Sequence, residues 1–197
     1  NASGSHLRFQ KDGSNKHFIG SGGGFGLGDV DDLSLRTVDN IIFGVGTSEK
    51  IRIDSAGRVL IGRTASRMVG GSTTYAKLQV AGTSQSESSI SIVNNENNTN
   101  GAFLFIGKTR GSSVGTSTIV QNGDTLGGLS FIGADGNDTN NRTAEITAVV
   151  NGGPGNNTIP TDLTFSTSTQ NASQMAERMI IYSTGRILIG NGASEQG

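Results

Sequence analysis

A segment of fifteen residues occurs twice in this chain, and the repetition limits the folds that the sequence can adopt. The segments SEKIRIDSAGRVLIG (48–62) and AERMIIYSTGRILIG (176–190) align without a gap at an offset of 128 residues. The two copies are identical at eight positions, and we take five of these as the structural repeat, Glu49, Ile53, Gly57, Arg58 and Gly62 in the first copy and Glu177, Ile181, Gly185, Arg186 and Gly190 in the second. A catalytic site rarely needs one segment twice, so the repetition favours a structure built from modules.

Each copy of the repeat has the pattern of a β-hairpin. Ile51 and Ile53 alternate with polar residues, which places the apolar side chains on one face of a strand. Residues 54–57 begin with Asp and end with Gly, a preference of type I turns, and residues 58–61 then return as the partner strand.

The arginine after each turn glycine has two interpretations. Arg58 and Arg186 could recognise an acidic group, but we favour a structural pairing with Glu49 and Glu177 on the neighbouring strand or chain, because the whole hairpin recurs with them.

The repeat also predicts the module boundaries. DLSLRT (32–37) resembles DLTFST (162–167), so we expect the repeat to extend upstream of the hairpin. We predict a first module over residues 1–66, a Gly/Ser/Thr connector over 67–75 and a second module over 76–197.

The composition indicates strands with little core. The chain has 31 glycines in 197 residues, about twice the usual fraction of about 7%. Hydrophobic residues make up only 32% and aromatic residues 5%. Disorder is one interpretation, but the apolar residues form short alternating runs, as strands require. We therefore predict an all-β, elongated and hairpin-rich fold whose burial is completed by other copies of the chain.

The expected strands are short and separated by turn dipeptides. They include ISIVNN (90–95), AFLFIGKT (102–109) and STIVQ (117–121). Asx-Gly dipeptides favour the positive φ of tight hairpin turns, and they occur at Asp12-Gly13, Asn122-Gly123, Asp135-Gly136 and Asn151-Gly152.

Charge and residue usage exclude several classes of function. The net charge is −1 with no basic block, which argues against nucleic-acid binding. No apolar run reaches the roughly 18 residues of a membrane span. Cysteine is absent, so disulfides and thiolate metal sites are excluded. The chain begins at Asn1 without an initiator Met, so we expect a fragment or a processed piece.

No segment of the sequence gives a strong signal for catalysis or for ligand binding. Residues 102–109 fit a relaxed phosphate-loop pattern, but bulky apolar residues fill the positions where that loop needs small ones. The acidic segments 29–32 and 135–138 could bind a hard cation or act as turns. His6 and His17 are the only histidines, and no nucleophile accompanies them. We predict no catalytic residue, no metal and no cofactor, and hence no enzyme.

The motif ER-[MI]-x-I-x-S-x-G-R-[VI]-L-I-G resembles the recurrent terminal hairpin of bacteriophage tail-fibre and virion-fibre proteins, especially those of marine cyanophages. Three segments of the second module resemble a module of the same proteins, NGDTLGGLSFIGADGND (122–138), AEITAVVNG (144–152) and DLTFSTST (162–169). The resemblance implies a homotrimeric, intertwined β-structured fibre exposed on the virion, in contact with other virion proteins. We carry over no chaperone or self-cleaving activity.

The sequence therefore predicts a structural fibre protein that takes part in host attachment. Two exposed loops, 94–101 and 151–162, are the candidate receptor contacts, through hydrogen bonds to hydroxyls of a host cell-surface glycan. The candidate side chains are Asn94, Asn95, Asn97, Asn98, Asn100, Asn156 and Asn157. Two alternatives stay open, a fragment of a polysaccharide-degrading tailspike and a bacterial secreted adhesin.

Overall fold

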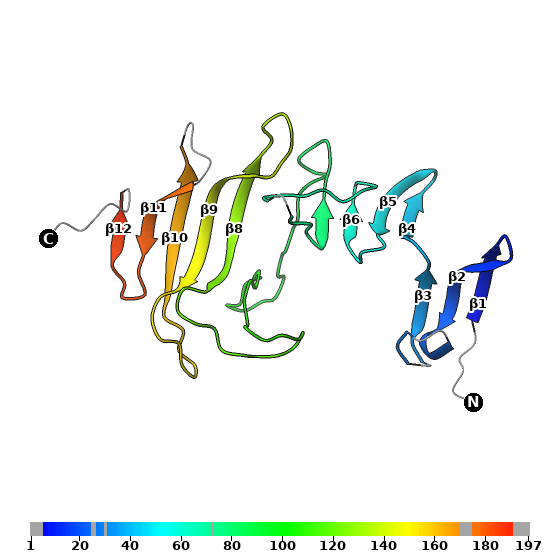
Figure 1. The fold of residues 1–197 in the computed structure, drawn as a ribbon, viewed down its shortest axis with the longest axis horizontal. Coiled ribbons are helices and arrows are strands. Elements are labelled where there is room, and N and C mark those ends of the chain that lie inside the picture. The colour runs from blue at the N-terminus through cyan, green and yellow to red at the C-terminus, as the bar shows by residue number, and fades with distance from the viewer. Residues whose placement is uncertain (1–5, 25–26, 30, 72, 170–174, 191–197) are drawn as a thin grey trace. The chain divides into compact units, whose positions relative to one another are not determined.

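The protein is an all-β chain in the computed structural model, which describes residues 6–24, 27–29, 31–71, 73–169 and 175–190 (Figure 1). The described strands are β1 His6–Lys11, β2 Ser14–Ser21, β3 Leu33–Thr37, β4 Ile41–Val45, β5 Ser48–Ile53, β6 Val59–Ile61, β7 Leu78–Val80, β8 Thr125–Gly133, β9 Asn141–Val150, β10 Thr161–Ser168, β11 Met175–Ile181 and β12 Ile187–Ile189, with one 3-10 turn, η1 Gly22–Gly24. The predicted all-β class is confirmed. In these ranges the structure contains no helix with the length and apolar character needed to cross a bilayer.

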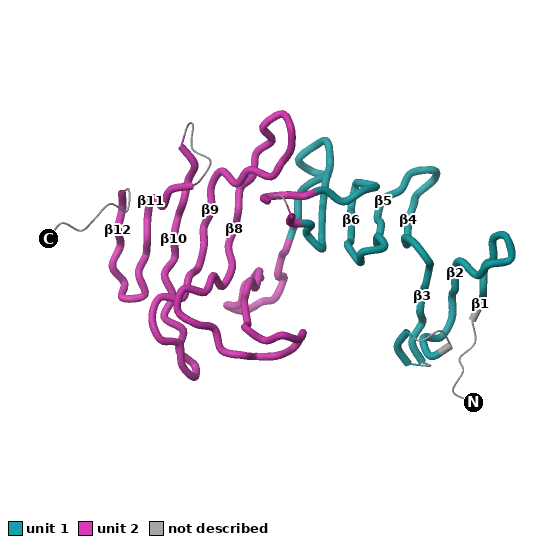
Figure 2. Tube along the Cα trace, viewed as in Figure 1, with its two compact units in different colours: residues 1–67, 75–91 teal, residues 68–74, 92–197 magenta. Residues whose placement is uncertain are grey.

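The chain divides into two compact units (Figure 2). Unit 1 comprises residues 1–67 and 75–91, and unit 2 comprises residues 68–74 and 92–197. The predicted boundaries at residues 66 and 76 were drawn from the sequence repeat rather than from contacts, and they stay a prediction.

Unit 1 contains two sheets. The first has the order β1-β2-β3, and the Asp12-Gly13 dipeptide forms the two-residue turn between β1 and β2. Both turn residues have positive φ, 52° and 74°, as this dipeptide predicts. The second sheet has the order β4-β5-β6-β7, in which β7 runs parallel to β6 and the other pairs are antiparallel.

Unit 2 is built on one antiparallel sheet with the order β12-β11-β10-β9-β8. Three of the predicted turn dipeptides lie in its loops rather than in two-residue turns. Gly123, Gly136 and Gly152 all have positive φ, but the loops around them are longer.

The two copies of the repeat form hairpins of the same register. In the first copy Ile51 pairs with Ile61, and in the second Met179 pairs with Ile189, which is the same pairing shifted by 128 residues. The turn bonds agree as well, because Gly57 N donates to Asp54 O at 2.8 Å and Gly185 N donates to Tyr182 O at 2.8 Å. The same backbone ladder is therefore built twice, in β5–β6 and in β11–β12.

The predicted upstream extension of the repeat is wrong. DLSLRT lies at β3, which pairs with β2 in a different sheet from the first hairpin. The strand that corresponds to β10 is β4, because both pair with their hairpin in the same register and with a register shift at the same point. At the start of each of these two strands, a side chain accepts a hydrogen bond from a backbone N–H of the hairpin turn. Asn40, just before β4, accepts from Ser55 N at 3.2 Å, and Asp162, in β10, accepts from Ser183 N at 2.8 Å.

The strands predicted at 90–95, 102–109 and 117–121 do not form in one copy of the chain, and residues 81–124 contain no strand (Figure 1). Segment 102–106 instead lies on the sheet of unit 2, where Leu104 and Ile106 line a small apolar hollow with residues of β8, β9 and β10. All four apolar side chains of this segment stay largely exposed, with fractions of 71% for Phe103, 67% for Leu104, 89% for Phe105 and 49% for Ile106. A strand needs a neighbouring strand for its backbone groups, and a single copy offers none here.

The described residues contain little apolar interior. Only Leu60, Val120 and Val150 are buried, whereas 28 large apolar side chains are exposed. Single exposed apolar residues are normal on protein surfaces, but this ratio is far from that of a self-sufficient domain of this length.

Candidate functional site

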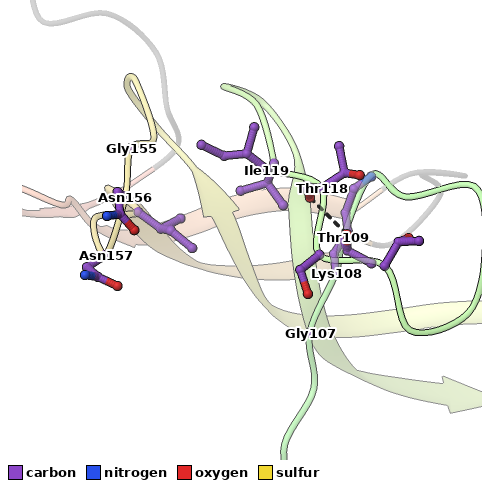
Figure 3. Close-up of a pocket in the computed structure, with 12 residues that line it drawn as sticks. Gly107, Lys108, Thr109, Thr118, Ile119, Gly155, Asn156 and Asn157 are labelled. Atoms are coloured by element: carbon purple, nitrogen blue, oxygen red, sulfur yellow. Dashed lines mark hydrogen bonds between the residues drawn. The ribbon is translucent and has the colours of Figure 1, made fainter.

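A groove with a mixed polar and apolar lining in unit 2 is the candidate site, and we call it the polar groove after its hydroxyl and amide groups. It is lined by residues 107–109, 116–120, 155–157 and Ile159 (Figure 3). Its volume is about 580 Å³. One wall is the loop between residues 107 and 120, and the other is the loop between β9 and β10.

The first wall is a loop that folds back on itself. Thr109 donates from its hydroxyl to the carbonyl oxygen of Thr118 at 2.9 Å, and Arg110 N donates to the same oxygen at 3.2 Å. At the tip, Thr116 donates from its hydroxyl to Ser113 O at 2.8 Å, next to Gly115 with a φ of 87°. The loop therefore keeps its shape through its own polar groups.

A buried carboxylate fastens this loop to the sheet. Asp124 receives two hydrogen bonds from the Arg110 guanidinium, both at 2.7 Å, and one from Gln121 N at 2.9 Å. Lys108 lies 3.5 Å from the same carboxylate. The Arg110 bonds, and then the Gln121 bond, hold the pKa of Asp124 well below its usual range. The Asp124 backbone bonds to buried Val150 at the end of β9, so the carboxylate ties the groove wall to the sheet.

The second wall is a tight turn that presents Asn156 and Asn157. Gly155 and Thr158 exchange backbone hydrogen bonds at 2.8 and 3.2 Å across the turn. Asn157 occupies the left-handed region with a φ of 58°, which asparagine tolerates better than most residues. Gly152 N donates to the Asn122 side chain at 2.8 Å, which joins the base of this loop to the start of β8.

The structure brings only one of the two predicted receptor loops to the groove. Asn156 and Asn157 line it, whereas Asn94, Asn95, Asn97, Asn98 and Asn100 do not. The latter form an exposed turn of their own, in which Asn94 Oδ1 accepts Glu96 N at 2.9 Å and Asn98 Oδ1 accepts Asn100 N at 2.8 Å. Sequence reasoning missed Lys108, Thr109 and Thr118 as groove residues, because their segment had the pattern of buried strands.

The predicted pairing of Arg58 with Glu49 does not form within one copy of the chain. Arg58 instead bonds Asp54 at 2.7 Å, which closes the turn, while Glu49 bonds Arg52 at 2.6 Å. Arg58 pairs with Asp54 because the Asp54 carboxylate already accepts a hydrogen bond from the Arg58 backbone N–H at 3.0 Å. That backbone bond is the main reason that the pKa of Asp54 is lowered.

The arginine of the second hairpin makes a different contact. Tyr182 stands where the first copy has Asp54, and Arg186 lies over its ring at 5.0 Å. Arg58 has a comparable ring at 5.0 Å, but this ring comes from Tyr75, the last residue of the predicted connector. Both arginines thus contribute to turn structure.

The acidic segments have their oxygens engaged in turns. Asp135 accepts hydrogen bonds from Asp138 N and Asn137 N at 3.0 and 2.9 Å, and these bonds lower the pKa of Asp135 to about 2. Asp32 accepts the N–H of Asp29 at 2.7 Å. Among the described residues no group of three or more His, Asp or Glu side chains is placed to hold a metal ion. His17 bonds Thr37 at 2.9 Å across the pairing of β2 with β3, and His6 lies in β1.

The fold is similar to that of carboxy-terminal domains of phage tail fibres. One solved structure is the carboxy-terminal domain of the bacteriophage T5 L-shaped tail fibre, with a TM-score of 0.57 and 12% identity over 99% of this chain and 80% of that one. Another is the same domain with its intra-molecular chaperone domain, with a TM-score of 0.60, 12% identity and coverage of 99% and 55%. This chain therefore spans about half of that longer structure. Because the sequence identity is only 12%, the structural similarity shows likeness of fold alone. Neither protein-family models nor curated protein sequences give a match.

Proposed function

We propose that this protein is a structural module of a bacteriophage fibre, located on the virion and engaged in attachment to the host surface. The observation that carries the proposal is the similarity of fold to T5 tail-fibre domains over 99% of the chain. The repeated hairpins support it, because fibres are built from consecutive modules.

The fibre assembles as a homotrimer in this proposal. Burial supports it, since one copy buries only three large apolar side chains in its described residues and leaves 28 exposed. Burying a large apolar side chain contributes roughly 1.5–3 kcal/mol. Three copies around a common axis would bury many of these side chains at once, and the unpaired segment 102–109 would gain neighbouring strands.

The polar groove then serves as the contact for a host cell-surface glycan. Its lining carries hydroxyl groups of Thr109, Thr116, Ser117 and Thr118 and the amides of Asn156 and Asn157. Hydroxyl and amide groups both donate and accept hydrogen bonds, which suits the hydroxyl groups of saccharides. The Asp124 anchor keeps this wall in place before a ligand arrives, which lowers the entropic cost of binding.

The test is binding of the purified chain to a panel of bacterial surface polysaccharides. Asn157→Gly removes the amide while it keeps the positive φ, and Asn156→Ala removes its neighbour. We expect the double variant to lose at least about tenfold in affinity, since each removed partner leaves saccharide groups unpaired. Asn97→Ala in the other Asn-rich loop is the matched control and should bind normally.

Three results would decide against the groove. These are equal binding by the double variant and the parent, loss of binding in the Asn97→Ala control alone, and absence of binding to every polysaccharide of the panel. The fibre role is tested separately, by measuring self-association of the chain with light scattering. We expect the groove variants to self-associate as the parent does.

A further inference from the structure

Asn-Gly dipeptides carry a chemistry of their own besides their role in turns. The main-chain nitrogen of the glycine can attack the side-chain amide carbon of the asparagine, because glycine has no Cβ to hinder the approach. The structure describes three such dipeptides, Asn100-Gly101, Asn122-Gly123 and Asn151-Gly152, and a fourth, Asn191-Gly192, lies outside the described residues. The three described dipeptides differ in how far their surroundings hold the two reacting groups.

Two of the dipeptides have their glycine nitrogens engaged in hydrogen bonds. Gly123 N donates to the carbonyl oxygen of Val150 at 2.8 Å. Gly152 N donates to the side-chain oxygen of Asn122 at 2.8 Å, so one dipeptide holds a reacting group of the other.

The side-chain amides of the same two dipeptides are held as well. The Asn122 side-chain oxygen is the acceptor of Gly152 N, and the Asn151 side-chain nitrogen donates to the carboxylate of Asp162 at 2.6 Å. Asp162 is only 7% exposed, so the second bond is shielded from water. Local opening has to break these bonds before either glycine nitrogen can reach its amide carbon.

Asn100-Gly101 has neither kind of restraint. Its backbone belongs to an exposed turn, in which Asn100 N donates to Asn98 Oδ1 at 2.8 Å and Asn100 O accepts from the Asn94 side chain at 3.2 Å. Within the ranges that the structure describes, no hydrogen bond engages the Asn100 side-chain amide or Gly101 N. Both residues are exposed, and a Cβ on Gly101 would have no atom within 4 Å. The turn therefore holds the main chain while both reacting groups stay accessible.

We propose that Asn100 is a site of spontaneous covalent modification, at which the side-chain amide is converted to a carboxyl group. Gly101 N gives its proton to the solvent and attacks Cγ of Asn100. A new C–N bond closes a succinimide ring, and the amide nitrogen takes up a proton and leaves as ammonia. Water then opens the ring at either carbonyl, which gives an aspartyl or an isoaspartyl residue. The reaction consumes water, releases ammonia and involves no oxidation or reduction.

The conversion changes the protein surface in two ways. It adds a negative charge to the loop 94–101, one of the two loops predicted to contact a receptor. In the isoaspartyl product the main chain runs through Cβ and Cγ, so the connection to the exposed segment 102–106 is longer by a methylene group. The fraction of converted chains therefore increases with the age of the protein. The proposal depends neither on the fibre role nor on the polar groove.

Peptide mapping by mass spectrometry tests the proposal on the full chain, in the assembly that it forms in solution. Trypsin cleavage after Lys and Arg places the three dipeptides in separate peptides, 78–108, 111–142 and 143–178. The chain is aged at mildly alkaline pH, either folded or unfolded in guanidinium chloride, and is digested at mildly acidic pH. Folding should slow the conversion of Asn122 and Asn151 at least about tenfold, because local opening has to precede the attack. Folding should slow the conversion of Asn100 by less than about threefold, because its reacting groups need no such opening.

A variant of the glycine separates the dipeptide chemistry from mere exposure of the asparagine. Gly101→Ala leaves Asn100 exposed but hinders the attack, and the open space around Gly101 accepts the added methyl group. We expect conversion in this variant to slow at least about fivefold. Thr99→Ala changes the residue on the other side of Asn100 and is the matched control, so it should convert at the parent's rate.

Asn122→Ala tests the protection directly, because it removes the acceptor of Gly152 N and should make Asn151 convert faster than in the parent. Asn100 that stays intact in the folded chain while the unfolded chain converts would overturn the proposal. Conversion of Asn151 as fast as that of Asn100 in the folded parent, or equal rates in Gly101→Ala and the parent, would do the same. The comparison of folded with unfolded parent needs no variant, so it decides the question even where a variant fails to fold.

Discussion

Leu60 and Leu188 are equivalent residues of the two hairpins, and their replacement by Ala measures what the covering strand β7 contributes. Leu60 is 0% exposed and lies between Arg52 of β5 and Gln79 of β7. Truncation of such a buried leucine costs about 2–5 kcal/mol, because the site loses apolar contacts and keeps a cavity. Leu188 is half-buried on a strand with one neighbour, so its truncation should cost about 1 kcal/mol.

The two tyrosines of the chain allow each unit to be followed separately. Tyr75 lies in unit 1 and Tyr182 in unit 2, and the chain has no Trp. Leu60→Ala is therefore made with Tyr182→Phe, and Leu188→Ala with Tyr75→Phe, each against its own tyrosine-variant parent. Urea unfolding followed by tyrosine fluorescence, at one fixed protein concentration, gives the two losses of unfolding free energy. An equal or larger loss for Leu188→Ala would refute the reasoning.

Further predictions concern the hairpin glycines and the groove anchor. Gly62 and Gly190 both have positive φ, but a Cβ on Gly62 would collide with the carbonyl oxygen of Ala81, whereas Gly190 faces open space. Thermal unfolding should therefore show a larger loss for Gly62→Ala than for Gly190→Ala, and equal losses would contradict this. The Arg110 bonds lower the pKa of Asp124 below its ordinary value of 3.8, so their contribution is present above that pH and is lost as the pH falls through the folded value. Melting curves between pH 7 and pH 2 should fall less steeply for Asp124→Asn than for the parent, and parallel curves would contradict the assignment.

Local patterns predicted the hairpins well, because their information lies within a few residues. The turn glycines at 57 and 185, the alternation of Ile51 with Ile53 and the Asp12-Gly13 turn all act over one strand and one turn. These are the features in which sequence and structure agree.

Pairing between distant segments was not predictable in the same way. DLSLRT is similar to DLTFST in sequence, but β4 and β10 share the same register with their hairpins. The structural equivalent of DLTFST is therefore NIIFGV. Likewise, the partner of Arg58 is Asp54 and not the predicted Glu49, because the turn places the Asp54 carboxylate next to the Arg58 backbone N–H.

The segment from Ile90 to Gln121 was the largest difference. Its alternating apolar residues have the local pattern of strands, but a strand also needs partners, and the single chain leaves Phe103 and Phe105 exposed to solvent. The polar groove follows from the same folding, since Thr109 and Thr118 meet only because their loop closes on itself.

Light scattering of the purified chain in solution tests whether copies of this protein complete each other's interior. The account predicts a stable particle of about 61 kDa, three times the chain mass of 20.3 kDa, whose mass does not fall on dilution. A folded species of 20.3 kDa that unfolds cooperatively would contradict the account, because it would have to be stable with only three buried apolar side chains in its described residues.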